Sequence, residues 1–276
     1  MAIRYDLSAV DILKIFGFDK PVGTKFIENI EEKYNMKLPE VYRNFMQFAY
    51  GSPLLETSDI YVGNADSKPY MLKSYYDVLE GCIEKAKEEW ASDPKSKKGK
   101  LYTLSKLDKE LWSTKVKNYL LIGTDYATGS IMPGIPIDDM QNDDPPVYWS
   151  FDDNSCERWR VLYPKLSTFL EGQFAAALCG MDYGTAEEAL EDFGWKYEEV
   201  YGYDEVTGEI GTTKSLLKKC RISIGKMKKY KTISQNKVFY CFDDEKNIVY
   251  AGYLEEDELS LSAIHHSDED DIFKNN

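Results

Sequence analysis

The chain has little of what most enzymes and metalloproteins use at their sites. Histidine occurs twice in 276 residues, as the adjacent pair His265 and His266. Adjacent side chains point to opposite faces of a strand, so the pair is a poor metal site and we expect it to be solvated. The usual sequence motifs of catalytic nucleophiles, zinc sites and calcium sites are missing. The paired carboxylates stand in exposed turns, whereas acid–base catalysis needs two carboxylates in different environments with different pKa values. These absences predict no enzymatic activity, no metal and no cofactor.

Cysteine and long apolar runs are also scarce. The five cysteines are odd in number, form no Cys-x-x-Cys pair and stand mostly among apolar residues. This is typical of small buried hydrophobic residues in a reducing compartment. Residues 1–16 mix charges with short apolar runs, unlike a signal peptide. No apolar run approaches the ~20 residues that span a bilayer. We therefore expect a cytoplasmic protein that does not bind membranes.

Positive charge is in deficit. The chain has 34 Lys and Arg against 48 Asp and Glu, a formal net charge of −14. Because phosphate binding requires a basic surface, this charge argues against nucleic acid as a partner. It is compatible with a basic protein partner, whose approach it would accelerate. Plain solubility explains the same charge, and charge alone favours that explanation over a basic partner.

The most informative stretch that is present runs from residue 24 to 51 and predicts two short amphipathic helices. The first carries apolar residues spaced for one helical face, at Phe26, Ile27, Ile30 and Tyr34. The second follows Leu38, with Pro39 at the first helical position and Glu40 where a negative charge favours the helix N-terminus. We expect this helix to bury Val41, Phe45, Phe48 and Ala49 and to end at Gly51.

Further along, strands alternate with helices. Residues 131–137 contain Pro133 and Pro136, so we expect an edge strand or an irregular segment there. A five-residue polar turn between two alternating runs predicts a hairpin over 238–253. We expect helices over 74–91 and 165–178, and strands over 119–122, 147–151 and 159–163.

The helix pair and three later segments resemble the SUKH superfamily, which includes bacterial immunity proteins and a fungal regulator of cell-wall synthesis. The later segments are YLLIGTDYATG (119–129), PPVYWSFDD (145–153) and LYPKLSTFLEGQFAAAL (162–178), which carries the pair Phe169-Leu170. One departure is Ala49-Tyr50-Gly51, where the family often has Asn-Gly. The matching residues of the helix pair are Ile27, Ile30, Leu38, Pro39, Glu40, Tyr42, Phe45, Met46 and Gly51.

The resemblance implies an α+β fold, with helices packed on one face of a mainly antiparallel sheet. It places a SUKH-like domain over residues 1–180, with a helical insertion at about 52–118. Residues 181–276 would form a C-terminal extension or a small second domain. The resemblance also implies a non-enzymatic immunity protein that binds and neutralises a cognate toxin, often a nuclease. A cytosolic regulatory scaffold is the alternative, and an enzyme with an unfamiliar site is the third possibility.

The partner surface suggested by the residues is an acidic segment, DDMQNDDPPVYWSFDD (138–153). Aromatic anchors surrounded by charge are typical of protein interfaces. It is equally possible that the two aromatic residues pack inside and that the acidic residues only bound a strand. The candidate partner-binding residues are Asp138, Asp139, Asp143, Asp144, Tyr148, Trp149, Asp152 and Asp153.

Overall fold

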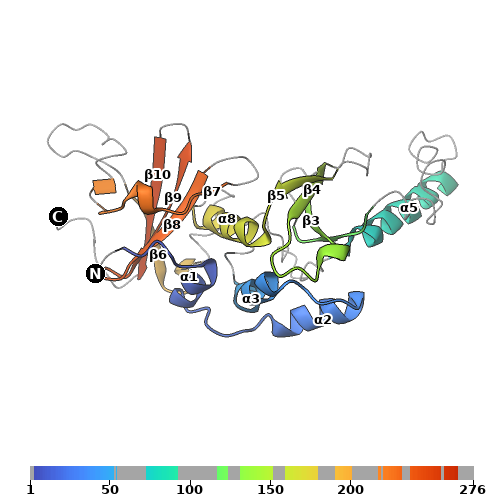
Figure 1. The fold of residues 1–276 in the computed structure, drawn as a ribbon, viewed down its shortest axis with the longest axis horizontal. Coiled ribbons are helices and arrows are strands. Elements are labelled where there is room, and N and C mark those ends of the chain that lie inside the picture. Colours follow the sequence, from blue (N-terminus) through green and yellow to red (C-terminus); the bar gives the residue numbers. More distant parts are fainter. Residues whose placement is uncertain are drawn as a thin grey trace.

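The computed structural model describes eleven parts of the chain: residues 3–52, 54, 73–92, 117–123, 131–151, 159–179, 190–200, 217–218, 220–231, 237–255 and 258–266. In these parts the expected α+β class is confirmed, with helices and two separate five-stranded sheets whose strand pairs are antiparallel. The two sheets lie on either side of helix α8 (Leu166–Leu178), as Figure 1 shows.

Three helices open the chain: α1 (Ala9–Ile15), α2 (Thr24–Tyr34) and α3 (Glu40–Ala49). Helix α1 was not expected from the sequence. It begins with a capping box in which Ser8 and Asp11 satisfy each other's backbone N–H. Helix α2 forms in the segment where the first helix was predicted. Phe26, Ile27 and Ile30 of its predicted apolar face are buried, whereas Tyr34 is half-buried.

The buried face of α3 differs from the prediction. Tyr42 and Met46 are fully buried, whereas Val41 and Phe48 are only partly buried. The helix packs against α1, α2 and α8 together, so its core-facing side is set by three neighbours and not by its own apolar residues alone. Pro39 lies at the N-cap, one residue before the helix.

The first sheet has the order β1-β2-β3-β4-β5. The helix predicted over 74–91 follows β1 as α5 (Tyr75–Ser92) and extends to one end of the molecule (Figure 1). The strands are β1 (Lys73–Ser74), β2 (Tyr119–Leu121), β3 (Ile131–Pro136), β4 (Val147–Phe151) and β5 (Arg160–Tyr163).

The expectation of an edge or irregular segment over 131–137 is wrong. Strand β3 is the central strand of the sheet and pairs with both β2 and β4. A proline loses its N–H donor but keeps its carbonyl acceptor. The Pro133 carbonyl accepts a 2.9 Å hydrogen bond from the N–H of Ile122, so the proline still takes part in the strand pairing.

The second sheet has the order β6-β10-β9-β8-β7. The predicted hairpin is confirmed as β8 and β9, which pair from Asp243–Ile248 outward. A short 3-10 turn, η2 (Ile224–Lys226), precedes β7. The strands are β6 (Trp195–Glu199), β7 (Tyr230–Lys231), β8 (Lys237–Asp243), β9 (Ile248–Glu255) and β10 (Glu258–His266).

The expectation that both histidines are solvated is wrong for His265 and confirmed for His266. Strand β10 lies between β6 and β9, and its residues 261–265 are all buried, so both of its faces are covered there. His265 is completely buried, with its Nε2 3.4 Å from the Glu198 carboxylate, whereas His266 is exposed and its ring lies 4.2 Å from that of Trp195.

One apolar core joins the helices to both sheets. Helix α8 is buried along most of its length because α3 and the first sheet pack against it on one side and the second sheet on the other. Phe174 meets Tyr240 of β8 edge to face, with ring centroids 5.7 Å apart. The division of the chain near residue 180 stays a prediction.

Candidate partner-binding site

An acidic loop, residues 137–144, joins β3 to β4 and begins with the 3-10 turn η1 (Ile137–Asp139). Its backbone is held at both ends: the Ile137 N–H donates to the Asn118 carbonyl at 3.0 Å, and the Asp143 carbonyl accepts from Val41 at 3.4 Å. Between them, Met140 is buried in the core. The loop is therefore a fixed part of the surface beside the start of α3.

Asp144 is used inside the fold. One of its carboxylate oxygens accepts from the Ser167 N–H at 2.7 Å, and the other accepts from the Ser167 hydroxyl at 2.8 Å. Ser167 lies in the first turn of α8, whose own N-cap, Lys165, supplies no side-chain bond. Asp144 thus caps α8 from a distant position in sequence, where its negative charge also favours the helix N-terminus.

The other acidic residues of the loop face outward. Asp138 and Asp143 are exposed and Asp139 is half-buried. Of these candidates, Asp143 forms part of the wall of a surface groove between the loop and the helix pair. The structure therefore separates the predicted aspartates: Asp144 caps a helix, and Asp143 lines a concave surface.

The groove has a volume of about 900 Å³. It lies where α2 ends, α3 begins and the acidic loop passes. Its lining residues are Glu31, Asn35, Met36, Lys37, Leu38, Pro39, Glu40, Arg43, Asn44, Gln47, Met140, Gln141 and Asp143.

Charges in the groove are partly engaged already. The Glu31 carboxylate accepts from the Leu38 N–H at 2.9 Å and lies 3.4 Å from the Arg43 guanidinium. This contact holds the turn between α2 and α3. The exposed carboxylates of Glu40 and Asp143 remain on two sides of the groove, with the exposed Lys37 nearby. The groove can therefore accept a cationic side chain between Glu40 and Asp143.

The predicted aromatic residues lie elsewhere. Tyr148 is half-buried in a cluster of rings, with its centroid 5.8 Å from that of Tyr119. Tyr119 also stacks on Trp159 at 3.8 Å, and burial, with a smaller effect of Tyr148, raises its pKa to about 12. Trp149 is half-buried on the next position of β4. Neither Tyr148 nor Trp149 lines the groove, and Asp152 and Asp153 lie outside the described residues.

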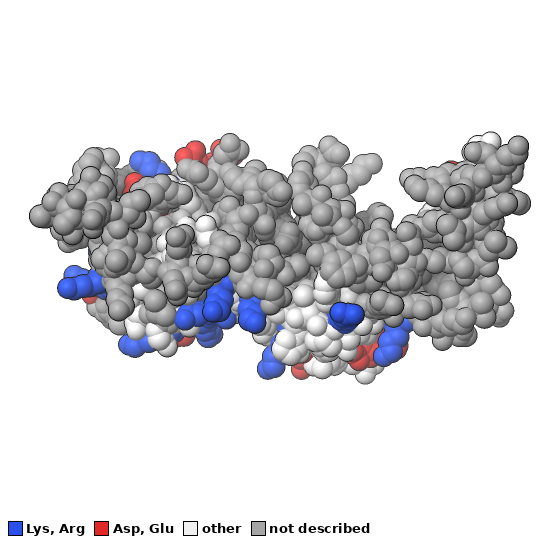
Figure 2. All heavy atoms as spheres, turned by 90° about the horizontal axis from the view of Figure 1, so that it is seen from above, with Lys and Arg blue, Asp and Glu red and all other residues white. Residues whose placement is uncertain are grey.

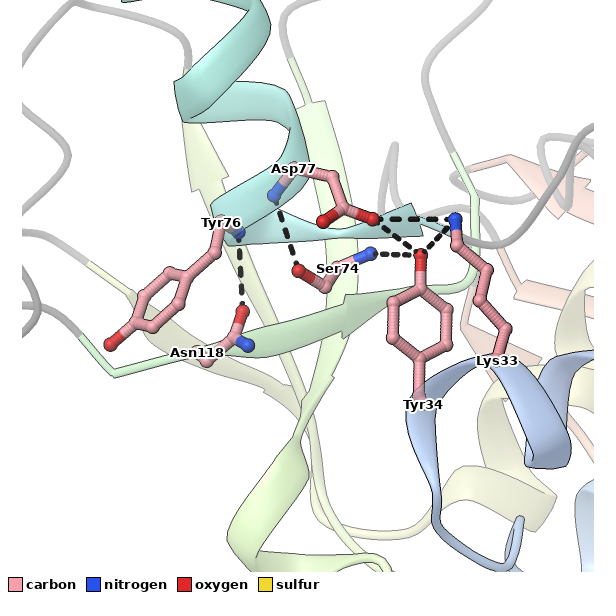
Figure 3. Close-up of polar contacts among 6 residues, drawn as sticks. All are labelled: Lys33, Tyr34, Ser74, Tyr76, Asp77 and Asn118. Carbon is pink, nitrogen blue, oxygen red and sulfur yellow. Dashed lines mark hydrogen bonds and ion pairs between the residues drawn. The ribbon is translucent and has the colours of Figure 1, made fainter. Parts of the chain in front are cut away.

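A second polar cluster ties α2 to the segment that carries α5 (Figure 3). The Tyr34 hydroxyl donates to the Asp77 carboxylate at 2.7 Å and accepts from the Ser74 N–H at 3.0 Å and from Lys33 at 2.8 Å. Burial raises the pKa of Asp77, but the bonds from Tyr34 and Lys33 outweigh it and hold that pKa below its ordinary value. This cluster fixes the start of α5 against the end of α2.

The residues that the structure describes contain no group of His, Cys, Asp or Glu side chains arranged to hold a metal ion. Among the same residues, no helix is long and apolar enough to cross a bilayer. Three cysteines, Cys179, Cys220 and Cys241, are buried, as expected for small hydrophobic residues.

Sequence reasoning missed most of the groove. Glu31, Lys37, Glu40 and Arg43 all lie in the segment that was interpreted as two helices, and of these only Glu40 was given a role, at a helix N-terminus. The available signal was the turn at residues 35–39, because opposite charges on each side of a tight turn face each other across it.

Two helices, an antiparallel sheet and a closing helix, arranged around one core, define the architecture of this α+β protein. The chain belongs to the SMI1/KNR4 family (SUKH-1), whose model matches residues 21–172, more than half of the chain. The match covers α2, α3, the first sheet and half of α8, and includes every residue of the groove. Comparisons with curated proteins and with solved structures found no match. Membership in this family is consistent with an immunity protein.

Proposed function

We propose that this chain is a non-enzymatic immunity protein of the cytoplasm, which binds and neutralises a basic cognate toxin of the nuclease class. The groove beside the acidic loop is the proposed contact surface. This assignment is supported by the family match, since the matched residues include all those that line the groove.

The observation that carries the proposal is the position of Glu40 and Asp143. Both carboxylates are exposed, and both border a concave surface whose backbone is fixed by hydrogen bonds. A lysine or arginine side chain of the toxin can lie between them and gain two charge-assisted hydrogen bonds. Because the loop is held by α3 and the core, little conformational entropy is lost on binding.

The net charge alone does not supply this surface. Figure 2 shows Lys and Arg side chains over the described part of one long face, with Asp and Glu between them. The negative charge of the chain is therefore not spread evenly over its described surface. The proposal depends on the local carboxylates of the groove, and overall charge adds only long-range steering of the partner.

The test is binding to toxins encoded next to this gene. The full chain is titrated with each candidate by calorimetry, and toxin activity is measured with and without it. We expect one toxin to be bound and inhibited, with affinity falling as salt shortens the Debye length below ~8 Å. Failure of every neighbouring toxin to bind would remove the immunity function and favour the regulatory scaffold instead.

Charge-reversal variants locate the surface. Glu40→Lys and Asp143→Lys should each weaken toxin binding about ten-fold, mainly through faster dissociation, because each removes a direct contact. Asp192→Lys, at an exposed carboxylate outside the groove, is the matched control and should change affinity by less than about two-fold. Lys37→Glu should strengthen binding. Equal losses in the three lysine variants, Asp192→Lys included, would show that net charge acts without a defined site.

A further inference from the structure

A basic segment interrupts this acidic chain outside the part that matches the family. Between Ile210 and Phe242 there are nine Lys or Arg residues and not one Asp or Glu, although the whole chain carries a net charge of −14. The segment includes η2, β7 and most of β8. Its described lysines form what we call the basic corner: Lys218, Lys226, Lys228, Lys229, Lys231 and Lys237.

All lysines of the basic corner are exposed. Among the described residues none of them forms an ion pair, whereas the neighbouring Arg221 lies 3.8 Å from the Glu245 carboxylate. Lys228 lies near enough to Glu171 to lower the pKa of that carboxyl. Within the described part of the chain, the remaining lysines present their positive charge to solvent without an ion-pair partner.

Two of these lysines lie directly opposite each other. Lys231 of β7 pairs with Lys237 of β8 across the strands, on the sheet face opposite to that of Tyr230 and Val238. Like charges at directly opposed positions destabilise a sheet. The fold therefore tolerates a repulsion here that a Thr or Glu at either position would remove.

Protection of a sheet edge is the usual reason for lysine on an outer strand. Here one backbone group of β7, the Lys231 carbonyl, already has a partner. The Lys231 carbonyl accepts a hydrogen bond from the Tyr163 hydroxyl, and a Cβ added to Gly172 of α8 would lie 3.2 Å from that same carbonyl oxygen. Because the Lys231 carbonyl is already occupied by Tyr163 and faced by α8, edge protection alone does not explain the lysine pair.

The segment is also anchored, so its charges have fixed positions. Tyr230, between the lysines, stacks on Tyr240 with centroids 6.0 Å apart, and its hydroxyl lies 3.4 Å from the Glu171 carboxylate. Tyr230 thus points into the core while the lysines on either side of it stay exposed.

We propose that the basic corner is a second docking surface, which binds an acidic segment of a protein partner. Lys231 and Lys237 lie in the second sheet, and no lysine of the corner lines the toxin-binding groove. Nucleic acid is a less suitable partner. Proteins that bind nucleic acid use arginine side chains and exposed aromatic rings that stack on bases, whereas this corner has lysines and its aromatic ring, Tyr230, packs into the core. A short acidic segment can contact the corner within a Debye length of ~8 Å, where the negative charge elsewhere on the chain is screened.

The test uses the full chain and a fluorescent oligoglutamate peptide, followed by anisotropy at low and physiological salt. We expect salt-dependent binding that is about ten-fold weaker in Lys231→Glu/Lys237→Glu. The matched control, Lys20→Glu/Lys25→Glu, reverses two exposed lysines at the start of α2 and carries the same net charge. It should bind as the unmodified chain does.

Two further measurements keep the proposal open to refutation. Lys231→Thr should raise the melting temperature, because the lysine repulsion is relieved, and should weaken peptide binding at the same time. A single-stranded oligonucleotide of the same charge should bind more weakly than the peptide. Tighter oligonucleotide binding, equal losses in the control, or no peptide binding would each overturn the proposal.

Discussion

Glu171 is the residue that joins most parts of the molecule. Its carboxylate, on α8, accepts from the Ala9 N–H at the start of α1 at 3.1 Å and from the Tyr240 hydroxyl of β8. Burial raises its pKa above the ordinary value, and the hydrogen bonds only partly oppose this. A group with a raised pKa binds its proton more tightly in the folded state, so folding is favoured at low pH.

A pH series should detect this carboxyl. Its stabilising contribution is complete below its ordinary pKa of 4.5 and is lost as pH rises through the higher folded-state value. In Glu171→Gln that component disappears. We expect the free energy of unfolding, measured with urea from pH 4 to 8, to fall less with rising pH in the variant than in the unmodified chain. Parallel curves would contradict the raised pKa.

Gly23 allows α2 to start against the end of α3. A Cβ at this position would lie 2.0 Å from the Met46 carbonyl oxygen and 2.8 Å from the Tyr50 Cβ. Because the backbone must shift to admit it, Gly23→Ala should destabilise the protein by about 2–3 kcal/mol. Gly81→Ala is the control: it lies within α5 with no atom in reach, and should stabilise by up to about 1 kcal/mol. Thermal melts of both variants decide the point.

At the scale of elements, α8 depends on a cap from another segment. Asp144→Ala removes both bonds to Ser167 and should cost about 1 kcal/mol of unfolding free energy. Asp138→Ala, at an exposed position of the same loop, should stay within about 0.5 kcal/mol. Urea denaturation of the two variants compares them directly. Equal effects would show that loop charge and not capping is responsible.

The elements that the sequence predicted well are those set by local periodicity. Helix α2 and the β8–β9 hairpin have strong local patterns and appear where expected. Strand β3 was misjudged because its place at the centre of the sheet depends on β2 and β4, which no local pattern around Pro133 reveals. The buried side of α3 was shifted for the same reason, since α1 and α8 determine it.

The candidate site shows the same limit. Acidic side chains in residues 138–144 were evident from the sequence, but their separate roles were not. Asp144 caps α8, a contact between segments 23 residues apart, while Asp143 meets Glu40 at a groove formed by α2, α3 and the loop. Such roles follow from tertiary contacts, so composition could identify the loop but not the function of each carboxylate.

At the scale of the whole molecule, the core decides how the chain unfolds. Val238, Tyr240 and Phe242 of the second sheet belong to the same apolar cluster as Phe169 and Phe174 of α8. The backbone at residue 4, before α1, also forms two hydrogen bonds with β8 at residue 242. Removing residues 181–276 would therefore expose the face of α8 that packs against the second sheet.

This shared core predicts a single unfolding transition for the full chain, with calorimetric and van't Hoff enthalpies in agreement. Val238→Ala, which truncates a fully buried side chain of β8, should lower that one transition as a whole by about 1–3 kcal/mol. A fragment of residues 1–180 should lack a cooperative melt and near-ultraviolet dichroism. If the fragment instead melts cooperatively, and Val238→Ala shifts only one of two transitions, then the second sheet is an independent domain and α8 needs only the first sheet to fold.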